Sequence, residues 1–258
     1  MRTRRMAAAV TAAVVALAVV MLPGAAQANH RWGNYHWART ANPFTVELDN
    51  NVTSAWTSYL STASADWTTS TVLNTTIVNG SFGSRSSCTP ASGHVEVCNG
   101  SYGNNGWLGI ASISVSGSHI TSAYVKVNDT YFNQATYNTA PYRRLVMCQE
   151  VGHAFGLAHQ DENQTNANLG TCMDYTRDPD GPPNNEHPNA HDFAQLQTIY
   201  SHTDSFNTTS VAASPLSQLT NSPTSWGRMV EGSKAPGSTA TYERKVGRDT
   251  VFTLVIWA

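Results

Sequence analysis

The sequence predicts an α+β domain, in which several β-strands and a few amphipathic helices share one core. Two observations support this fold class. Short segments with alternating or continuous apolar residues are typical of strands, and they occupy residues 44–48, 75–78, 107–115 and 121–128. Apolar residues recur at helical spacing in two other segments, 51–69 and the segment after Pro188. The chain therefore mixes strands and helices along its length.

The elements follow one another in a simple order. The helix predicted over 51–69 has an apolar stripe made of Val52, Trp56, Tyr59, Leu60, Ala63 and Trp67. Residues 79–105 are rich in Gly, Ser, Asn and Cys, which favours a long loop. Ser116-Gly117-Ser118 predicts the turn between the next two strands. Phe193, Leu196, Ile199 and Tyr200 repeat at helical spacing, and Pro188 is expected in the first turn of that helix.

The end of the chain has a different composition. Residues 203–225 are rich in Ser, Thr, Asn and Pro, which indicates a linker or a surface crossing. Residues 226–258 predict a β-hairpin tail that turns at 247–249 and has its strongest strand at 251–257. So short a segment cannot bury a core of its own. We expect it to pack on the main domain, residues 29–202, or on a partner.

Residues 1–28 have the pattern of a secretory signal peptide. Arg2, Arg4 and Arg5 are followed by an apolar run over 7–22 and by the small-x-small sequence Ala26-Gln27-Ala28. The alternative is a membrane anchor, but the run is short and rich in alanine. The sequence therefore predicts a secreted, extracellular protein that has no membrane segment after cleavage.

The charge balance excludes some classes of partner. The chain has 15 Lys and Arg residues and 17 Asp and Glu residues, so it has no strong net charge. A nucleic-acid or anionic-membrane partner is therefore not expected. About 230 residues remain after the predicted cleavage, enough for one large domain with a small appendage. We expect a monomer.

All four cysteines lie after the predicted signal peptide, at 88, 98, 148 and 172. Disulfides are expected in a secreted protein, and four cysteines allow three connectivities. Their order favours Cys88–Cys98 and Cys148–Cys172. A cysteine-ligated zinc or a thiol nucleophile is the alternative, but the chain has no Cys-x-x-Cys pair.

The segment 148–161 concentrates the side chains that carry chemistry. Gln149 and His153 are four residues apart and share one face of a helix, with Glu150 beside them. Gly156 allows the positive φ that ends a helix, so the chain can turn back and bring His159 to the same point. A catalytic zinc takes three protein ligands and a water whose pKa it lowers toward ~7. Glu150 is placed to act as general base.

This stretch resembles the long zinc motif of the metzincin metalloproteases, and the chain is similar to their matrixin branch. The family motif is H-E-x-x-H-x-x-G-x-x-H, and Glu150, His153, Gly156 and His159 match it. Cys172-Met173-Asp174-Tyr175 resembles the family's Met-turn. The resemblance implies a twisted mixed β-sheet with an active-site helix and a C-terminal helix. It also implies that Met173 lies under the metal and that Tyr175 approaches the transition state.

The sequence departs from the family at Gln149, where the motif has a histidine. Gln149 can supply a weak third ligand through its amide oxygen, although zinc prefers nitrogen and sulfur donors. Another group can supply the third bond, and the candidates are Asp161, His187 and His191. In a third interpretation, the fold has lost catalysis and only binds.

The resemblance implies further roles. In metzincins a strand corresponding to 108–115 forms a sheet edge that pairs with an extended substrate. Asp192, near the start of the last helix, would anchor that helix onto the active-site region. Asp178 and Asp180 are candidate calcium ligands, or part of an ordinary loop. The remaining histidines, His30, His36, His94 and His119, are expected at the surface or in packing.

These observations favour a secreted zinc-dependent endopeptidase that acts on a protein or peptide substrate. One zinc ion would be held by His153, His159 and Gln149, with Glu150 as base and then acid. The alternative is a metzincin-shaped protein that holds a peptide or a surface without cutting it. A serine hydrolase finds no support, because the chain has no Gly-x-Ser-x-Gly.

Overall fold

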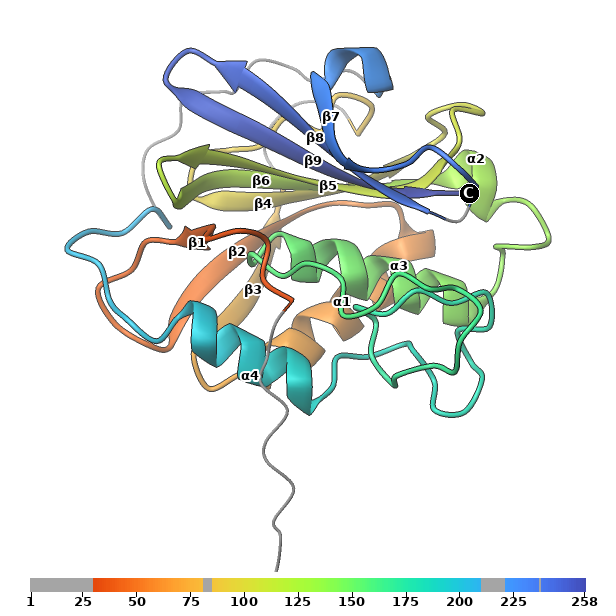
Figure 1. Ribbon diagram of the computed structural model, residues 1–258, viewed down its shortest axis with the longest axis horizontal. Coiled ribbons are helices and arrows are strands. Elements are labelled where there is room, and N and C mark those ends of the chain that lie inside the picture. The colour runs from red at the N-terminus through yellow and green to blue at the C-terminus, as the bar shows by residue number, and fades with distance from the viewer. Residues whose placement is uncertain (1–29, 81–84, 210–220, 237) are drawn as a thin grey trace, which may run out of the picture.

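The computed structural model describes residues 30–80, 85–209, 221–236 and 238–258. The predicted signal peptide lies outside these residues. A large β-sheet forms one layer, and three helices lie together beneath it in the view of Figure 1. They are α1 (Ser54–Trp67), α3 (Ala140–His153) and α4 (Ala190–Ile199). The predicted combination of a mixed sheet with few helices is therefore confirmed. No helix of the described residues is long and apolar enough to span a membrane.

The sheet described by the structure contains nine strands. They are β1 (His36–Trp37), β2 (Phe44–Asn51), β3 (Leu73–Asn79), β4 (His94–Gly100), β5 (Trp107–Ser116), β6 (His119–Asn128), β7 (Arg228–Gly232), β8 (Thr239–Val246) and β9 (Asp249–Trp257). Their spatial order is β3-β2-β4-β6-β5-β9-β8-β7, and β1 pairs with β6. The pairs among β1, β2, β3, β4 and β6 are parallel. The pairs from β6 through β5, β9 and β8 to β7 are antiparallel.

Strand β4 corrects the prediction that 79–105 is a long loop. It lies between β2 and β6 and is hydrogen-bonded to both. Val95 and Val97 are fully buried and belong to the core between the sheet and the helices. The alternation of Val95 and Val97 with polar residues is the only local sign of a strand. The surrounding segment is rich in Gly and Ser, so its composition predicts a loop instead. Hydrogen bonding to a strand on each side stabilises β4, although the local β-propensity of its residues is weak.

Two hydrophobic cores cover the two faces of the sheet. Successive residues of β6 enter them in turn, with Val125 and Val127 in the larger core and Tyr124 in the smaller one. This follows from the two-residue period of a strand. The larger core also receives the buried stripe of α1, made of Trp56, Leu60, Ala63 and Trp67, as its spacing predicts.

Side chains cap the N-terminal ends of α3 and α4. Thr139 accepts a hydrogen bond from the backbone N–H of Tyr142 and so begins α3. Asn189 and Asp192 form a capping box at the start of α4. Pro188 therefore precedes the cap, and the prediction that it lies in the first turn is wrong by two residues. A short helix, α2 (Asp129–Phe132), and a 3-10 turn, η1 (Pro223–Ser225), complete the described helices.

Both predicted disulfides are present, Cys88–Cys98 and Cys148–Cys172. The second joins α3, one residue before Gln149, to the turn that contains Met173. Closing a loop with a sequence separation of 24 residues contributes about 3 kcal/mol in the chain-entropy account. This covalent link fixes the helix that carries Gln149, Glu150 and His153 against that turn.

The C-terminal residues continue the same sheet. Strand β9 pairs with β5, and β8 and β7 follow it toward the edge (Figure 1). The described part of the segment predicted as a linker also packs on the domain. Thr208 accepts a hydrogen bond from the N–H of Ala38, and Asn221 accepts one from Lys126. Residues 210–220 lie outside the described residues.

Candidate metal and catalytic site

The end of α3 presents three of the predicted site residues. Gln149, Glu150 and His153 are all buried, and His153 is the last residue of the helix. Gly156 then adopts a φ of +88°, and a Cβ there would lie 2.3 Å from the carbonyl oxygen of Tyr35. Only glycine fits both the dihedral and the close approach. The chain turns back at this point and brings His159 against His153.

The two imidazoles face each other with free ring nitrogens. Their ring centroids are 4.5 Å apart and their planes are nearly perpendicular, at 87°. Nδ1 of His153 donates to the carbonyl oxygen of Leu157 at 2.9 Å, and Nδ1 of His159 donates to Glu162 at 3.0 Å. Each Nε2 therefore carries a lone pair. Within the described chain, both Nε2 atoms are buried and have no hydrogen-bond partner. These are the tautomer and the outer contacts typical of metal-binding histidines.

Glu150 is a fully buried carboxylate, and neither of its oxygens has a hydrogen-bond partner among the described residues. It lies between α3 and β5, where a Cβ on Gly109 would be only 2.3 Å from its Oε1. Burial raises the pKa of Glu150 well above its usual value. A lone buried charge is costly, and a cation nearby would offset that cost and lower the pKa.

Tyr175 and Met173 complete the site from the other side. The ring of Tyr175 lies 4.4 Å from that of His159, and its hydroxyl is buried without a partner among the described residues. Burial, followed by the charges of Glu150 and Glu162, raises the pKa of Tyr175, so the hydroxyl keeps its proton. A Cβ on Gly152 would lie 2.7 Å from Sδ of Met173. Met173 is therefore packed directly under the last turn of α3.

Asp192 links α4 to the Met173 turn. Its carboxylate accepts hydrogen bonds from the hydroxyl of Thr171 and from the backbone N–H of Asn189. The same hydroxyl accepts a hydrogen bond from the N–H of Met173. Burial raises the pKa of Asp192 to about 6. These contacts tie the start of α4 to the Met173 turn, and the anchoring role expected for Asp192 stays a prediction.

The three alternative ligands have side-chain contacts of their own. Asp161 accepts hydrogen bonds from Asn163 and Asn166 in its own loop. His187 pairs with Asp66 on α1 at 2.7 Å. The ring of His191 stacks on that of His30, with centroids 4.9 Å apart. Gln149 is instead adjacent to Glu150 on the helix, and its amide nitrogen is buried without a partner within the described chain.

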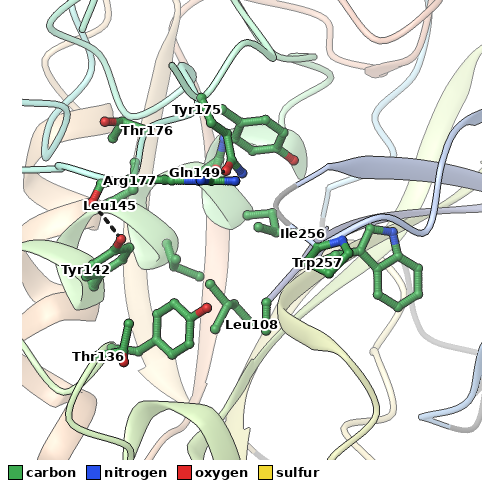
Figure 2. Close-up of a pocket in the computed structure, with 15 residues that line it drawn as sticks. Leu108, Thr136, Tyr142, Leu145, Gln149, Tyr175, Thr176, Arg177, Ile256 and Trp257 are labelled. Carbon is green, nitrogen blue, oxygen red and sulfur yellow. Dashed lines mark hydrogen bonds between the residues drawn. The ribbon is translucent and has the colours of Figure 1, made fainter. Parts of the chain in front are cut away.

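A cavity of about 380 Å³ lies beside these groups (Figure 2). Gln149 and Tyr175 line it at one end, and Leu108, Leu145 and Val146 supply apolar wall. Ile256 and Trp257 of β9 line it from the opposite side, as Figure 2 shows.

Strand β5 is not a free edge, which corrects the expectation for 108–115. It pairs with β6 on one side and with β9 on the other. Leu254 and Ile256 of β9 enter the larger core, next to the site. The expectation is wrong because the tail forms the backbone hydrogen bonds that a peptide would otherwise make.

Sequence reasoning did not find two residues near the site. The ring of Trp32 meets that of His153 edge-on at 6.1 Å. His30, which was expected at the surface or in packing, is buried, and its Nε2 lies 3.3 Å from Asp192. Both come from the N-terminal segment, and no motif or spacing connects that segment to the site.

Two groups of three acidic or histidine side chains have ligand atoms within 4.8 Å of one another in the described residues, and neither includes Glu150, His153 or His159. They are His36 with His119 and Asp204, and Glu47 with Asp49 and His94. Asp178 and Asp180, the candidate calcium ligands, belong to neither group. Calcium binding at these two aspartates stays a prediction.

Comparison with known proteins adds no relative. No family model matches the sequence, and no curated protein matches it significantly.

Proposed function

We propose that the protein is a zinc-dependent endopeptidase of metzincin type, with a mixed-sheet fold of that kind. One observation carries the proposal. Nε2 of His153, Nε2 of His159 and both carboxylate oxygens of Glu150 are buried and lack hydrogen-bond partners within the described chain. Buried polar groups are almost always paired, and an exception calls for an explanation. A metal ion bound by the two imidazoles explains all three groups at once.

The donor set fits zinc. Two neutral imidazoles suit this ion, and catalytic sites add a third ligand and keep one position open. Gln149 supplies the third ligand in the proposal, because it shares a helix face with His153 and faces the cavity. Bound zinc would polarise the substrate carbonyl and lower the pKa of a water.

The chain's own groups would carry the proton transfers. Glu150 takes a proton from the attacking water and gives it to the leaving amine. Its buried position, with no competing hydrogen bond among the described residues, leaves both oxygens free for this exchange. The protonated hydroxyl of Tyr175 donates a hydrogen bond to the oxygen on which negative charge develops. Cleavage of a peptide bond needs all three of these transfers and contacts.

Access to the site sets a condition on the proposed reaction. Ile256 and Trp257 of β9 form part of the wall of the cavity beside Gln149, so the cavity opens when that strand moves. An extended peptide that adds to β5 needs the edge that β9 occupies. In the proposed enzyme the structure is therefore the closed form, and β9 leaves β5 before a peptide binds.

A binding protein that does not cleave is the second candidate. The observation that favours it is Gln149 itself, because a neutral oxygen donor holds zinc more weakly than a third imidazole. Such a protein keeps the fold and the cavity but turns over no peptide. The two candidates differ in whether Glu150 has a chemical task.

Metal content and peptide cleavage together test the proposal. Elemental mass spectrometry on the full chain should find zinc that is lost in His159→Ala and kept in Glu150→Gln, whereas cleavage should be lost in both. His187→Ala is the matched control, since His187 is paired with an aspartate away from the site. It should change neither quantity. Equal zinc content in wild type and His159→Ala, after purification with added zinc, would overturn the proposal.

A further inference from the structure

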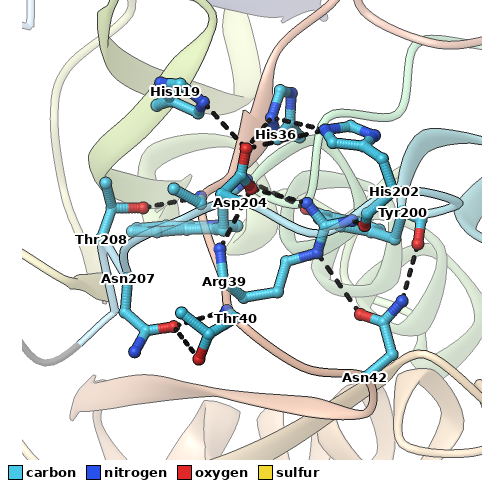
Figure 3. A network of polar contacts seen from close by, with 12 residues as sticks. His36, Arg39, Thr40, Asn42, His119, Tyr200, His202, Asp204, Asn207 and Thr208 are labelled. Atoms are coloured by element: carbon cyan, nitrogen blue, oxygen red, sulfur yellow. Dashed lines mark hydrogen bonds and ion pairs between the residues drawn. The ribbon is translucent and has the colours of Figure 1, made fainter.

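Three histidines and one aspartate meet at another place on the domain. His36 comes from β1, His119 from the first residue of β6, and His202 and Asp204 from the segment after α4. Figure 3 shows the three imidazoles arranged around the carboxylate of Asp204. We call these four residues the Asp204 cluster. It shares no residue with the site at His153 and His159.

Ligand atoms of His36, His119 and Asp204 lie within 4.8 Å of one another, and Nε2 of His202 lies close to two of these residues, Asp204 and His36. Asp204 Oδ1 lies 3.2 Å from Nε2 of His119, 3.7 Å from that of His36 and 3.8 Å from that of His202. Nε2 of His36 and Nε2 of His202 are 3.2 Å apart. A tetrahedral zinc with bonds of about 2.0–2.1 Å places its ligand atoms about 3.3 Å from each other. These four separations are near that value.

The outer contacts orient the donor atoms inward. Asp204 uses its other oxygen, Oδ2, to accept from the guanidinium of Arg39 at 2.9 Å and from the Arg39 backbone N–H at 3.2 Å. Nδ1 of His36 donates to the carbonyl oxygen of Asn34 at 2.8 Å. Oδ1 of Asp204 and the lone pair of His36 Nε2 therefore both point into the cluster. A carbonyl behind the histidine and a cation behind the carboxylate are typical outer contacts of metal ligands.

Hydrogen bonding gives each acceptor of the cluster a donor but leaves two acceptors facing each other. His119 can donate to Asp204, and His202 can donate to His36. In neutral His36, Nε2 has no proton, because Nδ1 holds it for Asn34. Two acceptors, Oδ1 of Asp204 and Nε2 of His36, then face each other at 3.7 Å. A cation between these two acceptor atoms would be bound by both of them.

We propose that the Asp204 cluster is a second, structural zinc site. Three imidazole nitrogens and one carboxylate oxygen are a donor set that zinc favours. Four protein ligands fill a tetrahedron, which is the mark of a structural rather than a catalytic site. The ion would fasten β1 and the segment after α4 to the β5–β6 turn. The proposal is independent of the function proposed above.

Metal stoichiometry and thermal stability test the second site. We would count zinc in the full chain and measure its melting temperature with and without added zinc, for wild type, His202→Ala and His119→Ala. Each variant should lose one zinc per chain and the zinc-dependent rise in melting temperature. His202 is half exposed, so its truncation should leave the fold intact. His187→Ala, which removes another exposed histidine paired with an aspartate, should behave as wild type.

The outcomes separate the two metal sites. If both sites hold zinc, wild type has two ions, and His159→Ala and His202→Ala each have one. If only the Asp204 cluster holds zinc, wild type has one ion, and His202→Ala has none. Zinc content and melting behaviour equal to wild type in both His202→Ala and His119→Ala would overturn the proposal. The cluster would then be a hydrogen-bond network only.

Discussion

The two groups of histidines differ in what faces the imidazole nitrogens. In the Asp204 cluster, Oδ1 of the carboxylate lies within 3.8 Å of three Nε2 atoms, and Arg39 donates to its other oxygen, Oδ2. At the proposed catalytic site, the Nε2 atoms of His153 and His159 have no partner within the described chain, and the nearby Glu150 is also unpaired. One group is nearly complete without an ion, and the other depends on a group from outside the chain.

This difference has opposite consequences for stability. Burying unpaired polar groups opposes folding, by about 1–3 kcal/mol for each such group. Sites that act on substrates retain such groups, because a donor or acceptor that is already paired within the protein cannot bind a metal or a substrate. The Asp204 cluster lies nearer the surface, and its groups are mostly paired, so it opposes folding less. The comparison predicts that activity depends on the first group and stability on the second.

Glu150→Gln should have the largest effect, and it tests whether activity depends on the unpaired groups at the proposed catalytic site. The amide cannot take a proton from water, so kcat/KM for peptide cleavage should fall about 10³-fold. The metal-free variant should be more stable than wild type at neutral pH by about 1–3 kcal/mol, because the pKa of Glu150 is raised and its ionised form opposes folding. Peptide hydrolysis and urea denaturation measure the two effects.

Glu96→Gln is the control for Glu150→Gln. Glu96 is likewise fully buried, with both oxygens unpartnered among the described residues, but it lies on β4. It should keep full cleavage activity. Equal losses of activity in the two variants would mean that Glu150 acts through folding and not through chemistry.

Locking β9 onto β5 should give the next largest effect. Ser112 and Thr253 are register partners on these strands, and their hydroxyl oxygens are 3.0 Å apart. A disulfide in the double variant Ser112→Cys/Thr253→Cys should reduce cleavage of extended peptides at least 10-fold if β9 leaves β5 during turnover. Activity would be compared before and after oxidation of the new pair.

A second cysteine pair controls for the disulfide itself. Lys245 and Thr250 face each other across β8 and β9, which fold back on each other next to the edge of the sheet. Lys245→Cys/Thr250→Cys joins those two strands without holding either one on β5, so its activity should not change on oxidation. Unchanged cleavage in the oxidised Ser112–Thr253 pair would mean that the substrate enters by another route.

The comparison also shows how far the sequence can predict the structure. The residues of the proposed catalytic site lie within one short stretch and one turn, so helical spacing and Gly156 are enough to bring Glu150, His153 and His159 together. The residues of the Asp204 cluster are scattered from His36 to Asp204. Only the pairing of β1 with β6 and the path after α4 unite them, and no local pattern encodes such contacts.

The strands likewise divide into those that local sequence predicts and those that depend on distant segments. Strands with strong apolar runs, such as β5, β6 and β9, are readable because their residues are buried on both faces. Strand β4 is not, because its position between two parallel neighbours stabilises a segment with weak local preference. The occupied edge of β5 was also missed. Whether a strand lies at an edge depends on what a distant segment does, and here that segment is β9.

Chelation should separate the two metal sites by order of loss. The proposed catalytic zinc has two imidazoles and a glutamine, whereas the Asp204 cluster offers three imidazoles and a carboxylate. Zinc should therefore leave the first site at lower chelator concentration, and activity should disappear before the melting temperature falls. A titration with chelator, followed by both readouts, would show two separated phases. In His202→Ala only the activity phase should remain, and simultaneous loss in wild type would contradict the proposed difference in affinity.

Gln149→His should reduce the difference in zinc affinity between the two proposed sites. A third imidazole in place of the amide should raise zinc affinity at the first site about 10-fold or more. Gln164→His is the matched control, because Gln164 also lines the cavity but is only partly buried and is bonded to Arg177. Zinc affinity by competition with a chelating dye distinguishes the two variants. No gain in Gln149→His would place the Gln149 side chain away from the metal.

Glu96 provides the smallest effect and the sharpest test of why buried carboxylates persist. It lies beside Asp49 across β2 and β4. Burial, followed by the charge of Asp49, raises the pKa of Glu96 from 4.5 to about 9. The folded state therefore holds a proton that the unfolded state has released between these two pH values. Its contribution to stability is present below about pH 4.5 and is lost as pH rises toward 9.

Replacing Glu96 with glutamine should remove this pH dependence, since the amide resembles the protonated acid. Glu96→Gln should match wild type near pH 4.5 and exceed it by about 1–3 kcal/mol at pH 8 in urea denaturation. Glu231→Gln, at an exposed glutamate on β7, should show no such difference. If Glu96→Gln were less stable than wild type at pH 8, the carboxylate would have a partner that its charge serves. Glu96 would then belong with the ligand-binding groups, and the contrast between catalytic and structural carboxylates would have to be redrawn.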